Sequence, residues 1–160
     1  MDIMPLICNL VIEATTSMPH SEQAERAAIT QLMARYTING DRGDVKGLAA
    51  CFAHDGVLEF PGARAEGPDN IVKALTSGTR DPALSLVRHH LTSSLVELGG
   101  SSGATGRTYF QVFSNIGLDH AGVYVDRFVR LPGGWYFHHR QVRIDWQSPD
   151  SLFRKFETRH

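Results

Sequence analysis

The sequence lacks the features that would place it in several specialised classes of protein. No apolar run approaches the roughly 20 residues that a membrane-spanning helix needs, so we expect no membrane partner. Basic and acidic residues number 16 and 17 and are dispersed along the chain, which argues against a surface for nucleic acid. The two cysteines, Cys8 and Cys51, have neither metal-ligand spacing nor a disulfide-rich pattern. Such cysteine usage favours the reducing cytoplasm.

The common motifs of nucleotide binding and nucleophilic catalysis are also missing. No G-x-S-x-G elbow, P-loop or dinucleotide fingerprint stands between a predicted strand and a predicted helix. The N-terminus has no secretory pattern, because Asp2 replaces the usual positive charge and Asn9 interrupts the apolar stretch. We therefore expect no cofactor, and we interpret residues 1–18 as a flexible extension.

The first half of the chain has helical periodicity. Ser21 can cap a helix whose apolar side chains recur with helical spacing from Ile29 to Tyr36. An Asn-Gly pair then signals the helix end, so Asp41 is expected just past the helix. Shorter helices are predicted after Asp44 and from Pro68, with a short strand between them.

After residue 82 the period becomes extended, and polar or glycine-rich turn sequences separate four predicted strands. These strands are Arg88–Leu98, Arg107–Ser114, Gly122–Leu131 and Trp135–Trp146. The connection before the third is predicted to be the six-residue turn Asn115–His120. Helices followed by strands with hairpin-length connections predict one α+β domain with an antiparallel sheet.

A phenol, a carboxylate and an imidazole stand where such a fold could bring them together. Tyr36 and Asp41 close the first helix, and His89 and His90 open the first long strand. Together they would form an acid–base site that needs no metal. Each also has an ordinary interpretation: a core tyrosine, a turn or capping aspartate, and half-buried histidines. Successive strand residues face opposite ways, so only one of the two histidines can line a given pocket.

The last predicted strand adds His138, His139 and Arg143. One histidine from each pair could join Asp41 as a metal site, but no local ligand spacing supports this and we expect no metal. By alternation Arg143 shares a face with Trp135, Phe137, His139, Gln141 and Asp145. Its guanidinium could stabilise a developing anion or pair with Asp145.

From about residue 24 to residue 146 the chain resembles the SnoaL-like branch of the nuclear transport factor 2-like superfamily. The matching strings are AAITQLMARYTINGDRGD, RHHLTSSLVEL, ATGRTYF, GVYVDRFVR and GWYFHHRQVRIDW. Their spacing is similar to that of the bile-acid 7α-dehydratases and the hexachlorocyclohexane dehydrochlorinase. The resemblance implies a cone in which a curved antiparallel sheet and three helices enclose an apolar pocket. It also implies a domain spanning residues 19–148 and a C-terminal tail at 149–160.

The same resemblance implies roles for four residues. His89 matches the catalytic base and Asp41 the carboxylate that orients it. Tyr36 matches an acid–base tyrosine, and Arg143 matches a pocket-facing arginine. Phe60 and Val112 depart from the dehydratase pattern, so we expect a substrate other than a bile acid.

The resemblance leads us to expect a cofactor-independent enzyme that acts on a small apolar molecule, with a dehydratase-type lyase as first choice. The alternatives are an isomerase or cyclase using the same base, a non-catalytic binding protein, and a scaffold. The pocket walls are expected to come from Met33, Phe60, Leu91, Phe110, Val112 and Phe137. We also expect a homo-oligomer, a trimer ahead of a dimer, that associates through an exposed sheet face bearing Tyr124, Phe128 and Tyr136.

Overall fold

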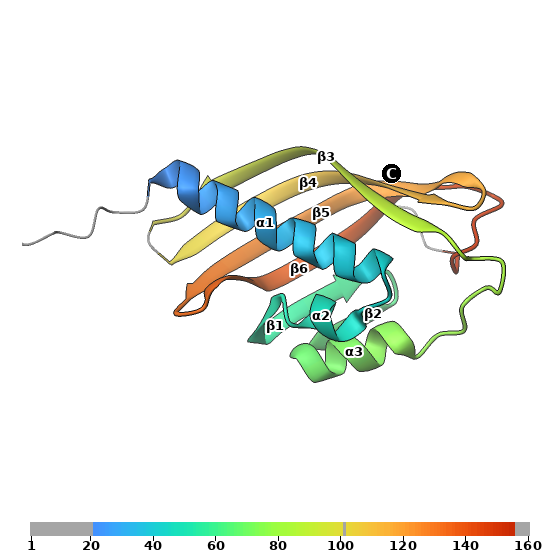
Figure 1. Ribbon diagram of the computed structural model, residues 1–160, viewed down its shortest axis with the longest axis horizontal. Coiled ribbons are helices and arrows are strands. Elements are labelled where there is room, and N and C mark those ends of the chain that lie inside the picture. Colours follow the sequence, from blue (N-terminus) through green and yellow to red (C-terminus); the bar gives the residue numbers. More distant parts are fainter. Residues whose placement is uncertain (1–20, 101, 156–160) are drawn as a thin grey trace, which may run out of the picture.

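The fold is known from a computed structural model that describes residues 21–155 except residue 101. Three helices and six strands follow one another along the chain (Figure 1). Their bounds are α1 (Glu22–Asp41), α2 (Val45–Ala49), β1 (Phe52–Phe60), β2 (Ala63–Glu66), α3 (Pro68–Thr76), β3 (Val87–Leu98), β4 (Gly103–Ser114), β5 (Gly117–Leu131) and β6 (Gly134–Gln147). The predicted N-terminal extension lies outside the described residues.

All six strands belong to one curved sheet with the order β2-β1-β6-β5-β4-β3, which does not close into a barrel. The long strands β3 to β6 form an antiparallel meander. At the other side β1 pairs parallel with β6, for example Leu58 with Arg140. The prediction of an α+β fold with a curved sheet is confirmed. The expectation of a wholly antiparallel sheet is wrong at this one pairing, because the sequence does not show that β1 returns to lie beside the last strand.

The helix signals read from the sequence act as predicted. The Ser21 hydroxyl accepts a hydrogen bond from the backbone N–H of Ala24 at 3.3 Å, and the Asp44 carboxylate accepts one from Gly47 at 2.9 Å. Pro68 is the first residue of α3. The long helix α1 lies along one face of the sheet, while α2 and α3 sit beside β1 and β2 (Figure 1).

The core lies between α1 and the covered face of the sheet, with an extension toward the far ends of the long strands. The main cluster joins the buried stripe of α1 to Phe52, Phe128 and Phe137. The smaller cluster consists of Phe110, Val112, Tyr124 and Ile144, with Phe153 packed against it.

This packing contradicts the expected association surface. Tyr124 and Phe128 are buried in the core, so they are not available on an exposed sheet face. Alternation shows which residues share a face of a strand, but not which face the helix covers. Only the position of α1 decides that. The homo-oligomer itself stays a prediction.

Two irregularities in β6 change the direction of its side chains. Phe128 pairs with Phe137, but the neighbouring Arg127 pairs with His139, which leaves His138 as an extra residue. A second irregularity occurs where Gly122 pairs with Ile144 and Ala121 with Trp146. An extra residue in a β-bulge reverses the alternation of the strand beyond it. Consequently, Arg140 faces the core in place of His139.

Candidate functional site

The structure brings Asp41 and His89 into direct contact. Asp41 Oδ1 lies 2.6 Å from His89 Nδ1, and Asp41 Oδ2 accepts the backbone N–H of His89 at 3.0 Å. The side chains retain only 9% and 23% of their exposure. Asp41 is the final residue of α1, so the prediction that it lies past the helix is wrong. The helix continues through Gly40, and one carboxylate at its end reaches both the ring and the backbone of β3.

This arrangement fixes the chemistry of the imidazole ring. An ionised carboxylate can only accept hydrogen bonds, so Nδ1 of His89 carries the hydrogen. The lone pair of the neutral ring is then on Nε2. A carboxylate in this position also stabilises the imidazolium that forms when Nε2 takes up a proton. The Asp41–His89 pair therefore has the geometry of a general base.

Aromatic rings connect the histidine to the centre of the molecule. The Phe110 ring lies 6.4 Å from that of His89 and is stacked on Tyr124 at 4.3 Å. Tyr124 in turn meets Tyr36 edge to face at 6.2 Å. Tyr36 is thus placed in the core, separated from His89 by two rings, and it makes no direct contact with Asp41 or His89 among the contacts of the described residues. Tyr124 was missed from the sequence as a site neighbour because it was assigned to the outer face.

The interior also holds a cation that sequence reasoning did not find. The Arg140 guanidinium has 0% exposure and donates to both oxygens of Asp126, at 2.8 and 2.7 Å. It also lies over the rings of Tyr36, Tyr124 and Phe137, at 4.3, 4.0 and 4.1 Å from their centroids. Among the described residues its Nη1 atom has no hydrogen-bond partner.

Burial and this cation act in opposite directions on the two phenols. Burial raises the pKa of Tyr36, and the positive charge of Arg140 offsets only part of that rise. Burial likewise holds the pKa of Tyr124 well above its usual value. Burial opposes the charge of Arg140 itself, but the carboxylate of Asp126 outweighs this and raises its pKa. At neutral pH both phenols are therefore protonated beside a permanent cation.

The predicted place of Arg143 is wrong. Its side chain is exposed, and its Nε donates to Gln141 at 3.1 Å. The bulge at His138 explains the error, since beyond it Arg140, Val142 and Ile144 point inward and Arg143 points outward. Arg140 occupies the interior position that alternation had assigned to Arg143.

The six residues predicted to line an apolar pocket are divided between different surroundings. Four are fully packed in the core, namely Met33, Phe110, Val112 and Phe137. Leu91 packs partly buried between the two clusters and lies two residues after His89 on β3. Phe60 packs partly buried against the main cluster and also lines a pocket beside the β1–β2 hairpin, whose lining does not include His89. Of the six, Phe110 and Val112 are buried next to the histidine, Val112 as its partner on β4, and Leu91 is partly buried beside it.

A second Asp–His pair lies in the same row of the sheet. His89 pairs with Val112, and Val112 pairs with His120 on the next strand. Two strand spacings separate the histidines, which is roughly 10 Å between their backbones. His120 Nδ1 lies 2.9 Å from Asp119 Oδ1, and both residues are buried.

This pair was missed because Asn115–His120 was predicted to be a turn. In the structure β5 begins at Gly117, so Asp119 and His120 are strand residues. The strand pairing that places them was not visible in the sequence. Burial lowers the pKa of His120, and the hydrogen bond that its ring donates to Asp119 offsets this only in part.

The other histidines of the predicted pairs do not converge on this site. The His90 ring packs against Phe113 at 5.1 Å. His139 Nε2 lies 3.1 Å from the carboxylate of Glu59. Among the described residues, Asp41 and the histidines of the two His-His pairs do not form a group that could hold a metal ion.

The fold and the site together define a class: an open α+β cone, with a carboxylate-bound histidine between its long helix and its sheet. The SnoaL-like domain model matches residues 21–141 of the chain. The protein belongs to this SnoaL-like domain family, as the resemblance had indicated.

Solved structures show the same fold. A variant of Rv3472, a protein of unknown function from Mycobacterium tuberculosis, is 29% identical and aligns with a TM-score of 0.68 over 82% of this chain and 78% of its own. An NTF2-like protein with a cystatin-like fold from Novosphingobium aromaticivorans is 27% identical, with a TM-score of 0.70 over 83% and 91%. A candidate scytalone dehydratase from the same species is 23% identical, with a TM-score of 0.73 over 85% and 93%. This last likeness shows the fold alone.

Two further observations concern matches to curated proteins and helices that could span a membrane. No curated protein matches the chain. Within residues 21–155, apart from 101, no helix is long and apolar enough to cross a membrane.

Proposed function

We propose that the protein is a cofactor-independent acid–base enzyme of the dehydratase type, acting on a small apolar molecule. The observation that carries the proposal is that Asp41 forms hydrogen bonds with both the ring and the backbone N–H of His89. A solvated or capping aspartate has no need to make two such bonds to one histidine. The choice of a dehydratase among acid–base enzymes follows the resemblance of the sequence motifs, and the candidate scytalone dehydratase shares the fold.

In the proposed reaction, His89 Nε2 removes a proton from a carbon adjacent to a carbonyl. The electrons of that C–H bond form a C=C bond, while the C–O bond on the next carbon breaks. The leaving hydroxyl takes a proton and departs as water. The proton on His89 returns to solvent, and the group that protonated the hydroxyl takes up a proton from solvent, so atoms and charge balance over the cycle.

The interior cation is proposed to assist the acid step. Tyr36 supplies the proton to the leaving oxygen, and the Arg140 guanidinium beside its ring stabilises the phenolate that results. Arg140 thereby takes the electrostatic role that the sequence had assigned to Arg143. Because Tyr36 is buried in this conformation, the step requires the substrate to displace neighbouring aromatic side chains.

The test is to follow proton abstraction and water loss separately on a panel of polycyclic and aromatic β-hydroxy ketones. Absorbance of the conjugated enone reports elimination, and deuterium exchange from D₂O reports proton abstraction. We expect His89→Ala and Asp41→Asn each to lower turnover by at least about 100-fold, since general acid–base catalysis contributes about 10²–10⁴-fold.

His90→Ala is the matched control, because His90 is the next residue on β3 and packs on Phe113. It should leave turnover within about twofold, as expected of a residue outside the proton path. Exchange without elimination would identify an isomerase instead. Full activity of both Asp41→Asn and His89→Ala would remove the proposed mechanism.

A further inference from the structure

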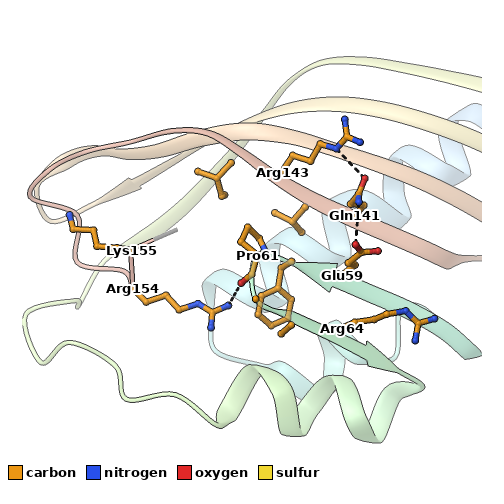
Figure 2. Close-up of a pocket in the computed structure, with 12 residues that line it drawn as sticks. Glu59, Pro61, Arg64, Gln141, Arg143, Arg154 and Lys155 are labelled. Atoms are coloured by element: carbon orange, nitrogen blue, oxygen red, sulfur yellow. Dashed lines mark hydrogen bonds between the residues drawn. The ribbon is translucent and has the colours of Figure 1, made fainter. Parts of the chain in front are cut away.

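A pocket of about 570 Å³ lies at the edge of β6, beside the β1–β2 hairpin (Figure 2). The pairing of β1 with β6 extends to Glu59 and Gln141, after which the chain turns away at Pro61. The stretch of β6 beyond that point is therefore not paired with β1. Arg154 and Lys155, from the segment that follows β6, form the opposite wall.

Cationic side chains dominate this pocket. Arg64, Arg143, Arg154 and Lys155 line it, against the single carboxylate of Glu59. Arg64 is already paired with Glu66 at 3.4 Å. Within the described part of the chain, neither Arg143 nor Lys155 has a carboxylate within ion-pair distance, so the pocket carries an excess of positive charge.

A hydrogen-bonded chain fixes the position of Arg143. Glu59 accepts from His139 and from the Gln141 amide, at 3.1 and 3.2 Å, and the Gln141 carbonyl oxygen accepts from Arg143 Nε. Figure 2 shows Glu59, Gln141 and Arg143 joined in this order by hydrogen bonds. The bonds from Gln141 and His139 lower the pKa of Glu59, so this carboxylate stays ionised and oriented toward its own partners. Only Nε of Arg143 takes part in this chain, so its two Nη groups can donate to a ligand at the rim of the pocket.

The rest of the lining is apolar. Phe60, Val142 and Ile144 contribute to it, and the Arg154 guanidinium lies 5.1 Å from the centroid of the Phe60 ring. Arg154 Nη2 also donates to the Pro61 carbonyl oxygen at 2.7 Å, which holds the C-terminal segment against the hairpin. An apolar wall beneath fixed cations suits a molecule with an apolar body and one anionic group.

Lys155 Nζ donates to the backbone carbonyl oxygens of Ser148 and Pro149, so it contributes its positive charge more than a direct contact. We propose that this pocket is a binding site for amphipathic carboxylates, with the carboxylate on Arg143 and the apolar body against Phe60. Neither Asp41 nor His89 lines this pocket, although Val142 and Ile144 of its lining also pack in the core. The proposal therefore does not depend on the proposed function.

The test uses 2-naphthoate and its neutral analogue 2-naphthalenemethanol as probes of the full chain. Isothermal titration gives the affinity, and amide chemical shifts give the location. We expect 2-naphthoate to bind at least tenfold tighter than the alcohol and to lose affinity as salt is raised, as a charge-assisted interaction should. The shifted amides should be those of residues 59–64 and 141–144.

Variants assign the effect to this pocket. Arg143→Gln should weaken 2-naphthoate binding by about three- to tenfold, as expected for a partly exposed charged hydrogen bond. Lys155→Gln should weaken it less, since that charge acts without a direct contact, and both variants should leave binding of the alcohol unaffected. Arg107→Gln, an exposed arginine on β4, should change neither affinity. His89→Ala should also leave 2-naphthoate binding intact.

Equal affinity for the two probes would overturn the proposal. Shifts centred on Asp41 and His89, with no effect of Arg143→Gln, would place the ligand in the candidate catalytic site and overturn it as well. Loss of turnover in His89→Ala bears only on the proposed function, so the two failures are distinguishable.

Discussion

At the scale of single residues, Asp41 couples the conformation of one side chain to the backbone that carries it. Its two oxygens bind the ring and the amide of His89, so the ring cannot rotate without breaking a short hydrogen bond. In the proposed mechanism, a base held in this way would lose little entropy when the substrate binds. The residue-level question is whether this orientation depends on the carboxylate.

Asp41→Asn answers it directly. An amide places a donating NH₂ group where one of the two carboxylate oxygens was, so it cannot reproduce both contacts of Asp41. We expect the second tautomer of His89, with the hydrogen on Nε2, to become populated. The ¹⁵N shifts of the imidazole ring distinguish the two tautomers. A single unchanged tautomer in Asp41→Asn would show that other contacts orient the ring.

Arg140 and Asp126 pose a different residue-level problem, because both are fully buried. Removing one partner leaves the other charge without compensation. We expect Asp126→Asn to lower the free energy of unfolding by about 3–5 kcal/mol. The double variant Arg140→Met, Asp126→Leu should recover a large part of that loss. Denaturant unfolding at neutral pH measures both, and a double variant less stable than Asp126→Asn would contradict this account.

At the scale of elements, the segment after β6 is attached to the beginning of β5. Asp119 accepts hydrogen bonds from Ser114, Ser151 and the backbone N–H of Leu152, at 2.8, 2.6 and 3.1 Å. Phe153 then packs edge to face on His120 at 4.8 Å. One buried carboxylate thus holds the first part of the predicted tail against the domain, and Arg154 attaches the segment further along.

Asp119→Ala should release this segment. We expect a loss of about 3 kcal/mol in the free energy of unfolding, because several donors to a charged group lose their acceptor. Hydrogen exchange at the amides of residues 151–153 should accelerate beyond the change in global stability. Asp145→Ala, an exposed aspartate of β6, is the control and should alter neither. Unchanged exchange at residues 151–153 in Asp119→Ala would contradict the attachment.

At the scale of the whole molecule, burial of an ionisable pair makes stability depend on pH. Burial lowers the pKa of His120 in the folded state, whereas the unfolded chain has the ordinary value of about 6.5. Above about pH 6.5 the His120 ring is neutral in both the folded and the unfolded state, so its contribution to stability is fully present. Below it the unfolded chain takes up a proton that the folded chain does not, so stability falls with acidification.

Asp119 contributes in a lower range. Burial acts to raise its pKa, but hydrogen bonds from His120, Ser151 and Ser114 together outweigh this and lower it. Its contribution is therefore present above about pH 3.9 and lost only in stronger acid.

Melting temperatures measured from pH 8 to pH 5 separate the contribution of His120 from that of Asp119. We expect the midpoint to fall by about 3 °C per unit that the His120 pKa is depressed. The fall should begin near pH 6.5 and be reduced in His120→Gln. His54 has a side chain that is 90% exposed, so His54→Gln should keep the full dependence of the melting temperature on pH. An unchanged slope in His120→Gln would assign the transition to another group.

Much of the local structure could be predicted because its causes are local. The caps at Ser21 and Asp44, the proline start of α3 and the apolar stripe of α1 depend on neighbours a few residues away. The strands of the meander were placed correctly, although β4 and β5 begin four and five residues earlier than predicted. The pair Asp119 and His120 was lost through that boundary error, since strand pairing, not local turn propensity, holds the segment.

The sequence by itself determined the α+β class, the order of the elements, the family and the nearness of Asp41 to His89, because periodicity, capping residues and motif spacing are written along the chain. Only the tertiary structure decided which residues face the interior. A one-residue bulge at His138 reverses the strand beyond it, and so puts Arg140 among the aromatic rings and Arg143 on the rim of a separate pocket. The packing of α1 likewise decided that Tyr124 and Phe128 are core residues. Such choices depend on contacts between distant segments, and no local pattern specifies them.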